Sequence, residues 1–304
     1  MNFAAAWGDT DGVDGTSGNQ PRHTLVAGNV VRELGIYEKQ SSAWFQAKSC
    51  QNTITGNILF NMPRAAINFN DGFGGGTTVS NNVIWNTCRE SGDHGPINSW
   101  DRLPFLTTLK WGPDHPPSFE ALQNQIYGNF VSADYGGSQA FDNDDGSSYY
   151  ATHDNVWYSS DGVKMDYRGH DSSFENNLVV VNAYDGQNCI NGGGFPEGHR
   201  SVFTGNKCIL AGCRGKNRTN AHGACNERIG NFGCDASDLR DSMADSWVLA
   251  NNTYYTPLGN ASLPCGVTIE TAAAGGSGVE EGSTAQRLPT DEELITMARH
   301  TLNM

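Results

Sequence analysis

The sequence lacks the long apolar run of a membrane-spanning helix and the extended Leu-, Lys- and Glu-rich segments of a helical protein. A membrane span needs about 20 consecutive apolar residues, so we expect no membrane insertion. Charged residues make up only 17 % of the chain, and few of the remaining residues are strong helix formers. This composition predicts a protein built mostly of β-strands and turns.

Positive charge is also scarce. Lys and Arg number 19 against 33 Asp and Glu, which gives a formal net charge of −14. Such a charge repels phosphate backbones and anionic lipid surfaces, so nucleic acid and membranes are excluded as partners. The composition favours a neutral or weakly cationic partner, and a polysaccharide or oligosaccharide fits that description.

What the sequence has in abundance is Gly and Asn, arranged as a repeat. An Asn that follows Gly, Asn or Asp and precedes a short, mostly apolar run recurs at intervals of 28, 25, 47, 26, 22 and 29 residues. The interval of 47 is either one repeat with an insertion or two repeats with a lost marker. The repeated residues are Asn29, Asn57, Asn82, Asn129, Asn155, Asn177 and Asn206.

This period predicts an all-β, right-handed parallel β-helix, a pectin-lyase-like solenoid. Each coil of such a fold supplies short strands to parallel sheets, and an Asn at each turn can hydrogen-bond to its equivalents in adjacent coils. Leucine-rich repeats have a similar period, but their Leu-x-x-Leu-x-Leu frame is absent. We therefore interpret the repeated asparagines as a structural ladder.

The repeat divides the chain into parts. Residues 1–266 are predicted to form the β-helix, with an insertion at about 106–127 that contains a short helix at 118–125, and with a Cys-rich end at 208–234. Residues 267–288 are expected to be a flexible linker. Thr290 and Glu293 form a capping-box pattern that opens a short C-terminal helix within 289–304. Its apolar side is expected to cover the last coil or to contact a partner.

Eight cysteines and three glycosylation sequons, at Asn217, Asn251 and Asn260, indicate a secreted glycoprotein with disulfides. A zinc site with His222 is the alternative for the Cys-rich end, but no Cys-x-x-Cys pair supports it. The first residues have no basic segment of a signal peptide. We therefore expect this sequence to be the C-terminal part of a longer secreted protein, whose first coil is completed by missing N-terminal coils or by a neighbouring subunit.

Polar residues recur 10 to 13 positions after successive ladder asparagines, which predicts a polar groove along the axis of the solenoid. These residues are Lys39, Asn68, Asp93, Asp142, Asp166 and Asn188. The segments Cys88–Phe105 and Phe141–Tyr150 are the richest in ionisable groups. Carboxylates on adjacent coils would lie about 5 Å apart, a separation that glycosidases use. The candidate catalytic residues are Asp93, Asp101, Asp142, Asp144 and Asp145. The candidate substrate-binding residues are Lys39, Arg64, Asp71, His94, Trp100, Arg102, Lys164, Asp166 and His170.

Glycosidic cleavage needs one protonated carboxyl group and one ionised carboxylate. Like charges within Asp142–Asp145 raise the pKa of at least one carboxyl group, which makes a proton donor. Asp145 precedes a glycine and is also a candidate turn former, and Asp93 is a candidate base tuned by an imidazolium at His94. No cofactor is expected. Calcium bound by this cluster is the alternative, although the spacing does not match an EF-hand loop.

Five blocks carry a resemblance to a known family: GNQPRHTLVAGN, GIYEKQSSAWFQAKSCQNTITGNI, NMPRAAINFNDGFGGG, NTCRESGDHGPINSWDR and FDNDDGSSYYATHDNVWYSSDGVKMD. Over roughly 15–209 the chain resembles secreted right-handed β-helix repeat proteins related to a glycoside hydrolase family that contains α-L-fucosidases and xylanases. The resemblance implies a carbohydrate-active enzyme with two catalytic Asp or Glu residues. The chain departs from that family in lacking the N-terminal coils.

Three hypotheses follow. The first is a glycoside hydrolase acting on a cell-wall or algal polysaccharide through paired carboxylates. The second is a polysaccharide lyase, in which Lys164 or Arg168 removes a proton from a uronate held by Ca²⁺. The third is a non-catalytic carbohydrate-binding or extracellular structural protein on the same scaffold.

Overall fold

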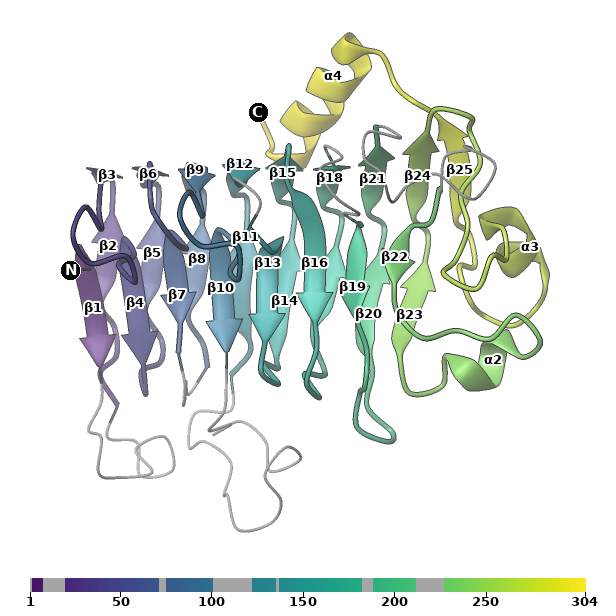
Figure 1. Ribbon diagram of the computed structural model, residues 1–304, viewed down its shortest axis with the longest axis horizontal. Coiled ribbons are helices and arrows are strands. Elements are labelled where there is room, and N and C mark those ends of the chain that lie inside the picture. The colour runs from purple at the N-terminus through teal and green to yellow at the C-terminus, as the bar shows by residue number, and fades with distance from the viewer. Residues whose placement is uncertain are drawn as a thin grey trace.

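The protein is a parallel β-helix (Figure 1). The computed structural model describes residues 2–7, 20–70, 75–100, 122–134, 137–181, 188–211 and 227–304. Within them, short strands stack into three all-parallel sheets, two of eight strands and one of nine. The predicted fold class is confirmed.

Each coil contributes one strand to each sheet, in the same order along the chain. The first sheet contains β1 (Ala4–Trp7), β4 (Trp44–Ala47), β7 (Ile67–Phe69), β10 (Ile97–Trp100), β13 (Gln139–Asp144), β16 (Asp161–Met165), β19 (Ile190–Gly192) and β22 (Gly230–Asn231). The second contains β2 (Leu25–Ala27), β5 (Thr53–Thr55), β8 (Thr78–Ser80), β11 (Asn124–Tyr127), β14 (Tyr150–His153), β17 (Ser173–Glu175), β20 (Ser201–Thr204) and β23 (Trp247–Ala250). The third contains β3 (Val30–Arg32), β6 (Ile58–Phe60), β9 (Val83–Thr87), β12 (Phe130–Asp134), β15 (Val156–Tyr158), β18 (Leu178–Val181), β21 (Lys207–Leu210), β24 (Thr253–Thr256) and β25 (Thr284–Arg287).

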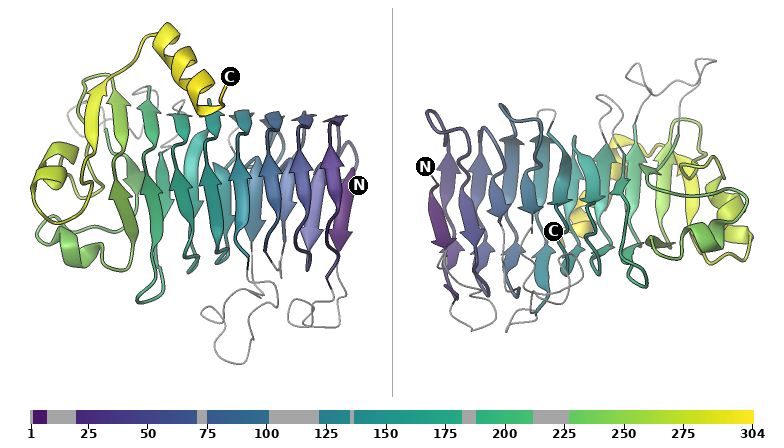
Figure 2. Two further views of the ribbon diagram at one scale, coloured as in Figure 1. Left: turned by 180° about the vertical axis from the view of Figure 1, so that it is seen from behind. Right: turned by 60° about the horizontal axis from the view of Figure 1, so that its bottom comes forward.

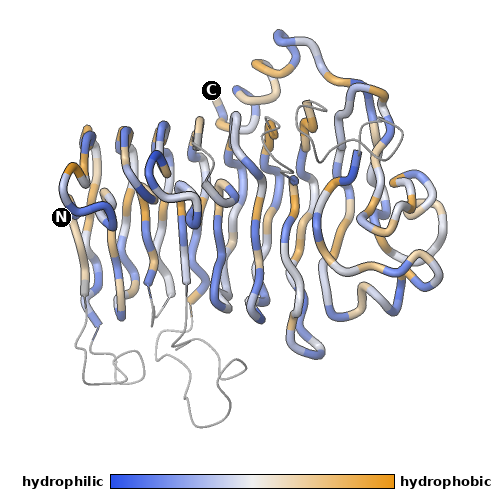
Figure 3. The backbone as a smooth tube through the Cα atoms, viewed as in Figure 1, coloured by the Kyte–Doolittle hydropathy of each residue, from blue (hydrophilic) through white to orange (hydrophobic). Residues whose placement is uncertain are grey.

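The interior is a stack of apolar side chains, because residues alternate between the two faces of a strand. Figure 3 shows this alternation of hydropathy along the strands. In the second sheet the inward positions of successive coils include Ile54, Val79, Ile126 and Phe174, which are all buried. Tyr150 and Trp157 are fully buried in the same core.

The predicted asparagine ladder is present. Asn155 Oδ1 accepts hydrogen bonds from the backbone N and the side-chain Nδ2 of Asn129, at 3.0 and 2.9 Å, and Asn155 donates in the same way to Asn177. The residue before each of these asparagines has a positive φ, as at Gly128 and Asp154. Only Gly, and less readily Asn or Asp, adopts that conformation at low cost, which explains the Gly/Asn/Asp–Asn pattern of the repeat.

The interval of 47 residues is one coil with an insertion, because Asn82 bonds directly to Asn129. The helix expected at 118–125 is corrected in part. Asn124–Tyr127 is strand β11, which pairs with β8 and β14, and Asn124 accepts a hydrogen bond from Thr77 N. The remainder of that expected helix lies outside the described residues.

The linker expected at 267–288 is also corrected. This segment contains α3 (Ile269–Ala274) and β25, which pairs with β24 and ends the third sheet. A further short helix, α2 (Leu239–Ser242), lies near α3 at the same end of the solenoid (Figure 1). The β-helix therefore continues through residue 287.

The C-terminal helix α4 (Asp291–Thr301) begins with the predicted Thr290–Glu293 capping box. It does not cover the last coil. Instead it folds back along the outside of the third sheet (Figure 2), where Leu294, Met297, Ala298 and Leu302 pack against an apolar cluster on that face. The cluster consists of Val156, Leu178, Val180, Ile209 and Tyr255.

Two disulfides, Cys189–Cys208 and Cys234–Cys265, join residues at and near the Cys-rich end. They confirm oxidation for Cys208 and Cys234 and indicate an oxidising, extracellular-type environment. Cys213, Cys225 and His222 lie outside the described residues. Among the described residues, no helix is both long enough and apolar enough to cross a membrane.

Candidate active site

The outer face of the first sheet carries a continuous polar row. Strand register places Asn68, Asn98, Asp142, Lys164 and Asn191 next to one another on successive strands, and Asn231 follows on β22. A shorter row lies beside it, in which Trp100 is opposite Asp144 and Asp166 follows the end of β16. These two rows hold the ionisable groups of the candidate site.

The predicted groove register is corrected by this pairing. Counting a constant number of residues from each ladder Asn put Lys39, Asp93 and Asn188 in the same row as Asp142, but none of them occupies a position in that row. The turns between the strands differ in length from coil to coil. A fixed number of residues after the ladder Asn therefore reaches a different position in each coil. Lys39 is instead an exposed residue that pairs with Glu90 at 2.9 Å.

Lys164 is the centre of the site. Its Nζ lies 3.1 Å from Asp142 Oδ1, 3.3 Å from Asp144 Oδ1 and 3.2 Å from Asp166 Oδ2. Burial alone would lower the pKa of Lys164, but the three carboxylates outweigh burial and raise the pKa above its ordinary value. Lys164 is therefore an ammonium ion at neutral pH.

Asp142 is held by the polypeptide on every side. Its Oδ2 accepts hydrogen bonds from Gly95 N and from Asn98 Nδ2, both at 3.2 Å. Gly95 can approach so closely because it has no side chain: a Cβ there would lie 1.9 Å from Gln139 O. Burial raises the pKa of Asp142 to about 6, although Lys164 opposes the rise. With no exposed side-chain surface, Asp142 positions Lys164 rather than contacting a ligand.

Asp144 and Asp166 differ from Asp142 in being accessible, with 17 % and 24 % of their side chains exposed. Their carboxyl groups both lie beside Lys164, and each shifts the pKa of the other. Burial raises the pKa of Asp166 to about 8, and the nearby Asp144 carboxyl group adds to the rise. Burial acts in the same direction on Asp144, but Asp166, Lys164 and the hydrogen bond from Asp145 N outweigh it and lower the pKa of Asp144.

Arg64, His94 and Trp100 form the side of the site toward the N-terminal coils. Arg64 Nη2 lies 2.9 Å from His94 Nε2, and the Arg64 guanidinium lies 4.7 Å from the centre of the Trp100 ring. Burial, together with the nearby Arg64, lowers the pKa of His94 to about 4. His94 is therefore neutral at pH 7, which corrects the expectation that an imidazolium there tunes Asp93. The Asp93 side chain itself is 89 % exposed.

The remaining sequence candidates lie elsewhere. Asp145 adopts a left-handed φ of 47° in the turn with Gly146, so it fits the turn-former alternative. His170 lies in the turn after β16 and bonds to Asp171 at 2.7 Å. Asp71, Asp101 and Arg102 lie outside the described residues.

Sequence reasoning missed the role of Asp166 as the partner of Asp144, having placed it among the substrate-binding residues. It also missed Asn98, Asn191 and Asn231. The alternation of inward apolar and outward polar residues in Val163–Lys164–Met165–Asp166 is the signal that could have found the pair, because it puts Lys164 and Asp166 on the same face.

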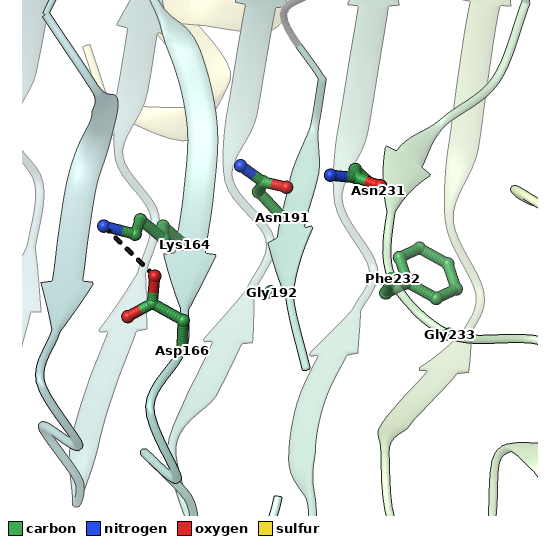
Figure 4. Close-up of a pocket in the computed structure, with 7 residues that line it drawn as sticks. All are labelled: Lys164, Asp166, Asn191, Gly192, Asn231, Phe232 and Gly233. Carbon is green, nitrogen blue, oxygen red and sulfur yellow. Dashed lines mark ion pairs between the residues drawn. The ribbon is translucent and has the colours of Figure 1, made fainter. Parts of the chain in front are cut away.

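An open pocket of about 570 Å³ adjoins Lys164 and Asp166 and continues toward the C-terminal coils. Figure 4 shows the amide groups of Asn191 and Asn231 in line with Lys164 across neighbouring strands, with Phe232 beyond them. Gly192 and Gly233 complete the lining. Comparisons with protein-family models, with curated proteins and with solved structures found no match to this chain.

Proposed function

We propose that the protein is a secreted glycoside hydrolase in which Asp144 and Asp166 are the two catalytic carboxyl groups. The observation that carries the proposal is that Asp144 Oδ1 and Asp166 Oδ2 both lie beside Lys164 Nζ, at 3.3 and 3.2 Å, and that Asp166 lines an open pocket. The pKa of Asp166 is raised and that of Asp144 is lowered. Two carboxyl groups whose environments push their pKa values apart divide the roles of acid and base between them.

The raised pKa keeps Asp166 protonated at neutral pH, so Asp166 is the general acid. It gives its proton to the glycosidic oxygen as the bond from that oxygen to the anomeric carbon breaks, and the ionised Asp144 attacks the anomeric carbon. The Asp166 carboxylate then takes a proton from water, which displaces the sugar from Asp144. Lys164 stabilises the Asp144 carboxylate before the attack and again when the sugar is released.

The separation of the two groups favours retention of configuration. Inverting enzymes hold their carboxyl groups about 6.5–9.5 Å apart to admit a water molecule, whereas retaining enzymes hold them about 5–5.5 Å apart. Asp144 Oδ1 and Asp166 Oδ2 lie 3.3 and 3.2 Å from the same Lys164 Nζ, so these two oxygens are at most about 6.5 Å apart, which favours the shorter separation.

The row of side-chain amides supports a chain-like saccharide as the substrate. From Lys164 to Asn231 the row crosses two strand spacings, about 10 Å, and its amides can donate to and accept from sugar hydroxyls. The acidic chain disfavours a polyanionic substrate. Fucose-containing glycans and xylans, which the sequence resemblance implies, meet these requirements when they carry little sulfate or uronate.

The lyase hypothesis receives less support from the same geometry. A lyase base must be deprotonated, yet three aspartates raise the pKa of Lys164. A calcium ion would need the space between Asp142, Asp144 and Asp166, and the Lys164 ammonium occupies that space.

The test is digestion of a glycan library that includes xylans and fucosylated glycans. We expect new reducing ends, and ¹H NMR of the first product should show the anomeric configuration of the substrate. Asp166→Asn and Asp144→Asn should each lower the rate by about 10²–10⁴-fold, whereas Asp145→Asn, the adjacent control, should retain it. Unsaturated products absorbing in the ultraviolet and abolished by a chelator would establish the lyase instead. Saccharide binding without cleavage would establish the non-catalytic alternative.

A further inference from the structure

A second cluster of polar side chains lies in the turns beside the second sheet. His170 and Asp171 belong to the turn between β16 and β17, and His199 belongs to the segment between β19 and β20. Two consecutive coils therefore meet at this cluster. Asp171 Oδ2 lies 2.7 Å from His170 Nδ1 and 2.8 Å from His199 Nδ1, so two imidazoles converge on one carboxylate oxygen.

We propose that His170, Asp171 and His199 form a binding site for a divalent first-row transition-metal ion, of which Zn²⁺ is the probe. One ligand atom from each of the three residues lies within 4.8 Å of the others. Zn²⁺ binds imidazole nitrogen and carboxylate oxygen at about 2.0–2.2 Å, so small movements of these atoms, roughly half an ångström, make room for the ion. Calcium and magnesium prefer sites made of oxygen alone.

The donor atoms at the cluster suit a cation. Asp171 Oδ2 offers a carboxylate oxygen, and His170 Nδ1 and His199 Nδ1 face it. Binding the ion through the two Nδ1 atoms requires each neutral imidazole to carry its proton on Nε2.

The polypeptide holds the three side chains in place. Asp171 N donates to Arg200 O at 3.0 Å, which ties the two coils together at the cluster, and His170 N donates to Ser148 Oγ at 3.1 Å. The Tyr149 ring packs edge-on against His170. Outer contacts of this kind orient metal ligands and tune their affinity.

Burial restricts the ring of His170. The imidazole of His170 is 1 % exposed, and its Nε2 has no hydrogen-bond partner in the part of the chain that the structure describes. The orientation of this buried ring is therefore set by the Nδ1 contact.

Access and an open coordination position are both present. Asp171 and His199 each expose 31 % of their side chains, so an ion can enter from solvent. Three protein ligands leave a fourth position of a tetrahedral zinc site for water or an external ligand. The bound ion would clamp two consecutive coils together, independently of the proposed hydrolase activity.

The chain contains a matched control in His153 and Asp154. His153 Nδ1 lies 2.7 Å from Asp154 Oδ2, and the two side chains are 35 % and 41 % exposed. This pair repeats the chemistry of His170 and Asp171 without a second imidazole.

The experiment is isothermal titration of the protein, purified in chelator and then freed of it, with ZnCl₂. We expect one strongly bound Zn²⁺ per chain. His199→Gln should weaken binding by more than about 100-fold, whereas His153→Gln should leave it unchanged. His199→Cys should retain the site, and Co²⁺ bound to this variant should show a thiolate-to-metal charge-transfer band.

Circular dichroism of each variant checks the fold, and His199 is exposed enough for its replacement to be tolerated. Three results would overturn the proposal: no binding of Zn²⁺ at millimolar concentration, unchanged affinity in His199→Gln, or equal loss in His199→Gln and His153→Gln.

Discussion

The asparagine ladder and the acidic row of the first sheet, by which we mean Lys164 with Asp142, Asp144 and Asp166, both run along the solenoid. They differ in how fully their polar atoms are hydrogen-bonded. In the ladder, Asn155 uses its amide oxygen and nitrogen in five hydrogen bonds to neighbouring coils and to its own turn. In the acidic row, Asp166 Oδ1 is buried without a hydrogen-bond partner among the described residues, and the pKa of Asp166 is raised.

The difference separates structure from function. A polar residue that recurs in every coil and is fully bonded stabilises the repeat. A polar residue that occurs in one coil only, with a shifted pKa and open space beside it, is costly to the fold, and the proposed activity would account for that cost. The following predictions test that contrast, from the largest expected effect to the smallest.

Asn155→Ala should lower the free energy of unfolding by about 3–5 kcal/mol, because it leaves several buried backbone and amide groups unbonded at about 1–3 kcal/mol each. Urea unfolding measures the change. Asn29→Ala at the start of the ladder is the control: Asn29 is only partly buried and donates to Asn57, so about 1 kcal/mol is expected. Equal losses would contradict the view that the ladder stabilises the fold because each buried Asn has all its polar atoms hydrogen-bonded.

Asp142→Asn should lower the free energy of unfolding by about 1–3 kcal/mol, because Lys164 loses one of its three anionic partners while two remain. The same variant should lower activity, since Lys164 is no longer positioned. Thermal unfolding and digestion rates measure the two effects. Asp145→Asn, in the turn beside the site, should change both by little, and a loss there as large as at Asp142 would count against the assigned roles.

Asp166→Asn should gain stability relative to the native protein as pH rises. The folded-state pKa of Asp166, about 8, is above the unfolded value of about 3.9, so the folded protein holds this proton more tightly. Stability of the native protein therefore falls as pH rises from about 4 to about 8. Between pH 5 and pH 7 we expect the variant to gain about 2–3 kcal/mol.

Chemical unfolding of both proteins across this pH range measures the gain. A difference in stability that is independent of pH would mean that Asp166 ionises normally.

Lys39→Ala should change the free energy of unfolding by less than about 1 kcal/mol. The Lys39–Glu90 pair is about half exposed, and exposed ion pairs contribute little because solvent and salt screen them. Thermal unfolding in low and high salt measures the difference. A larger loss would show that charge pairing outside the acidic row also carries stability.

The fold followed from the sequence because a solenoid repeats its local rules. Each turn needs a left-handed residue before the ladder Asn, so Gly128, Asp154 and their equivalents mark the coils directly. The capping box at Thr290 also depends only on residues close together in the sequence. The position of α4 on the third sheet does not, because its apolar side packs against strands of four different coils.

The sequence predicted the region of the candidate site but not which two carboxyl groups act together in it. Asp142, Asp144 and Lys164 follow from local charge density, but the partnership of Asp144 with Asp166 depends on the register of β13 and β16. That register depends on the lengths of the intervening turns, which a constant count from Asn129 and Asn155 ignores. The metal cluster escaped prediction for the same reason, since His199 comes from the next coil.

The most direct test of the central claim is the titration of the aspartate carboxyl carbons by ¹³C NMR in selectively labelled protein. The account predicts one resonance that titrates near pH 8 and is absent from Asp166→Asn, with a smaller inflection at the same pH in the resonance of Asp144. Titration of every aspartate below about pH 5 would contradict it, because no carboxyl group on the first sheet would then hold a proton at neutral pH.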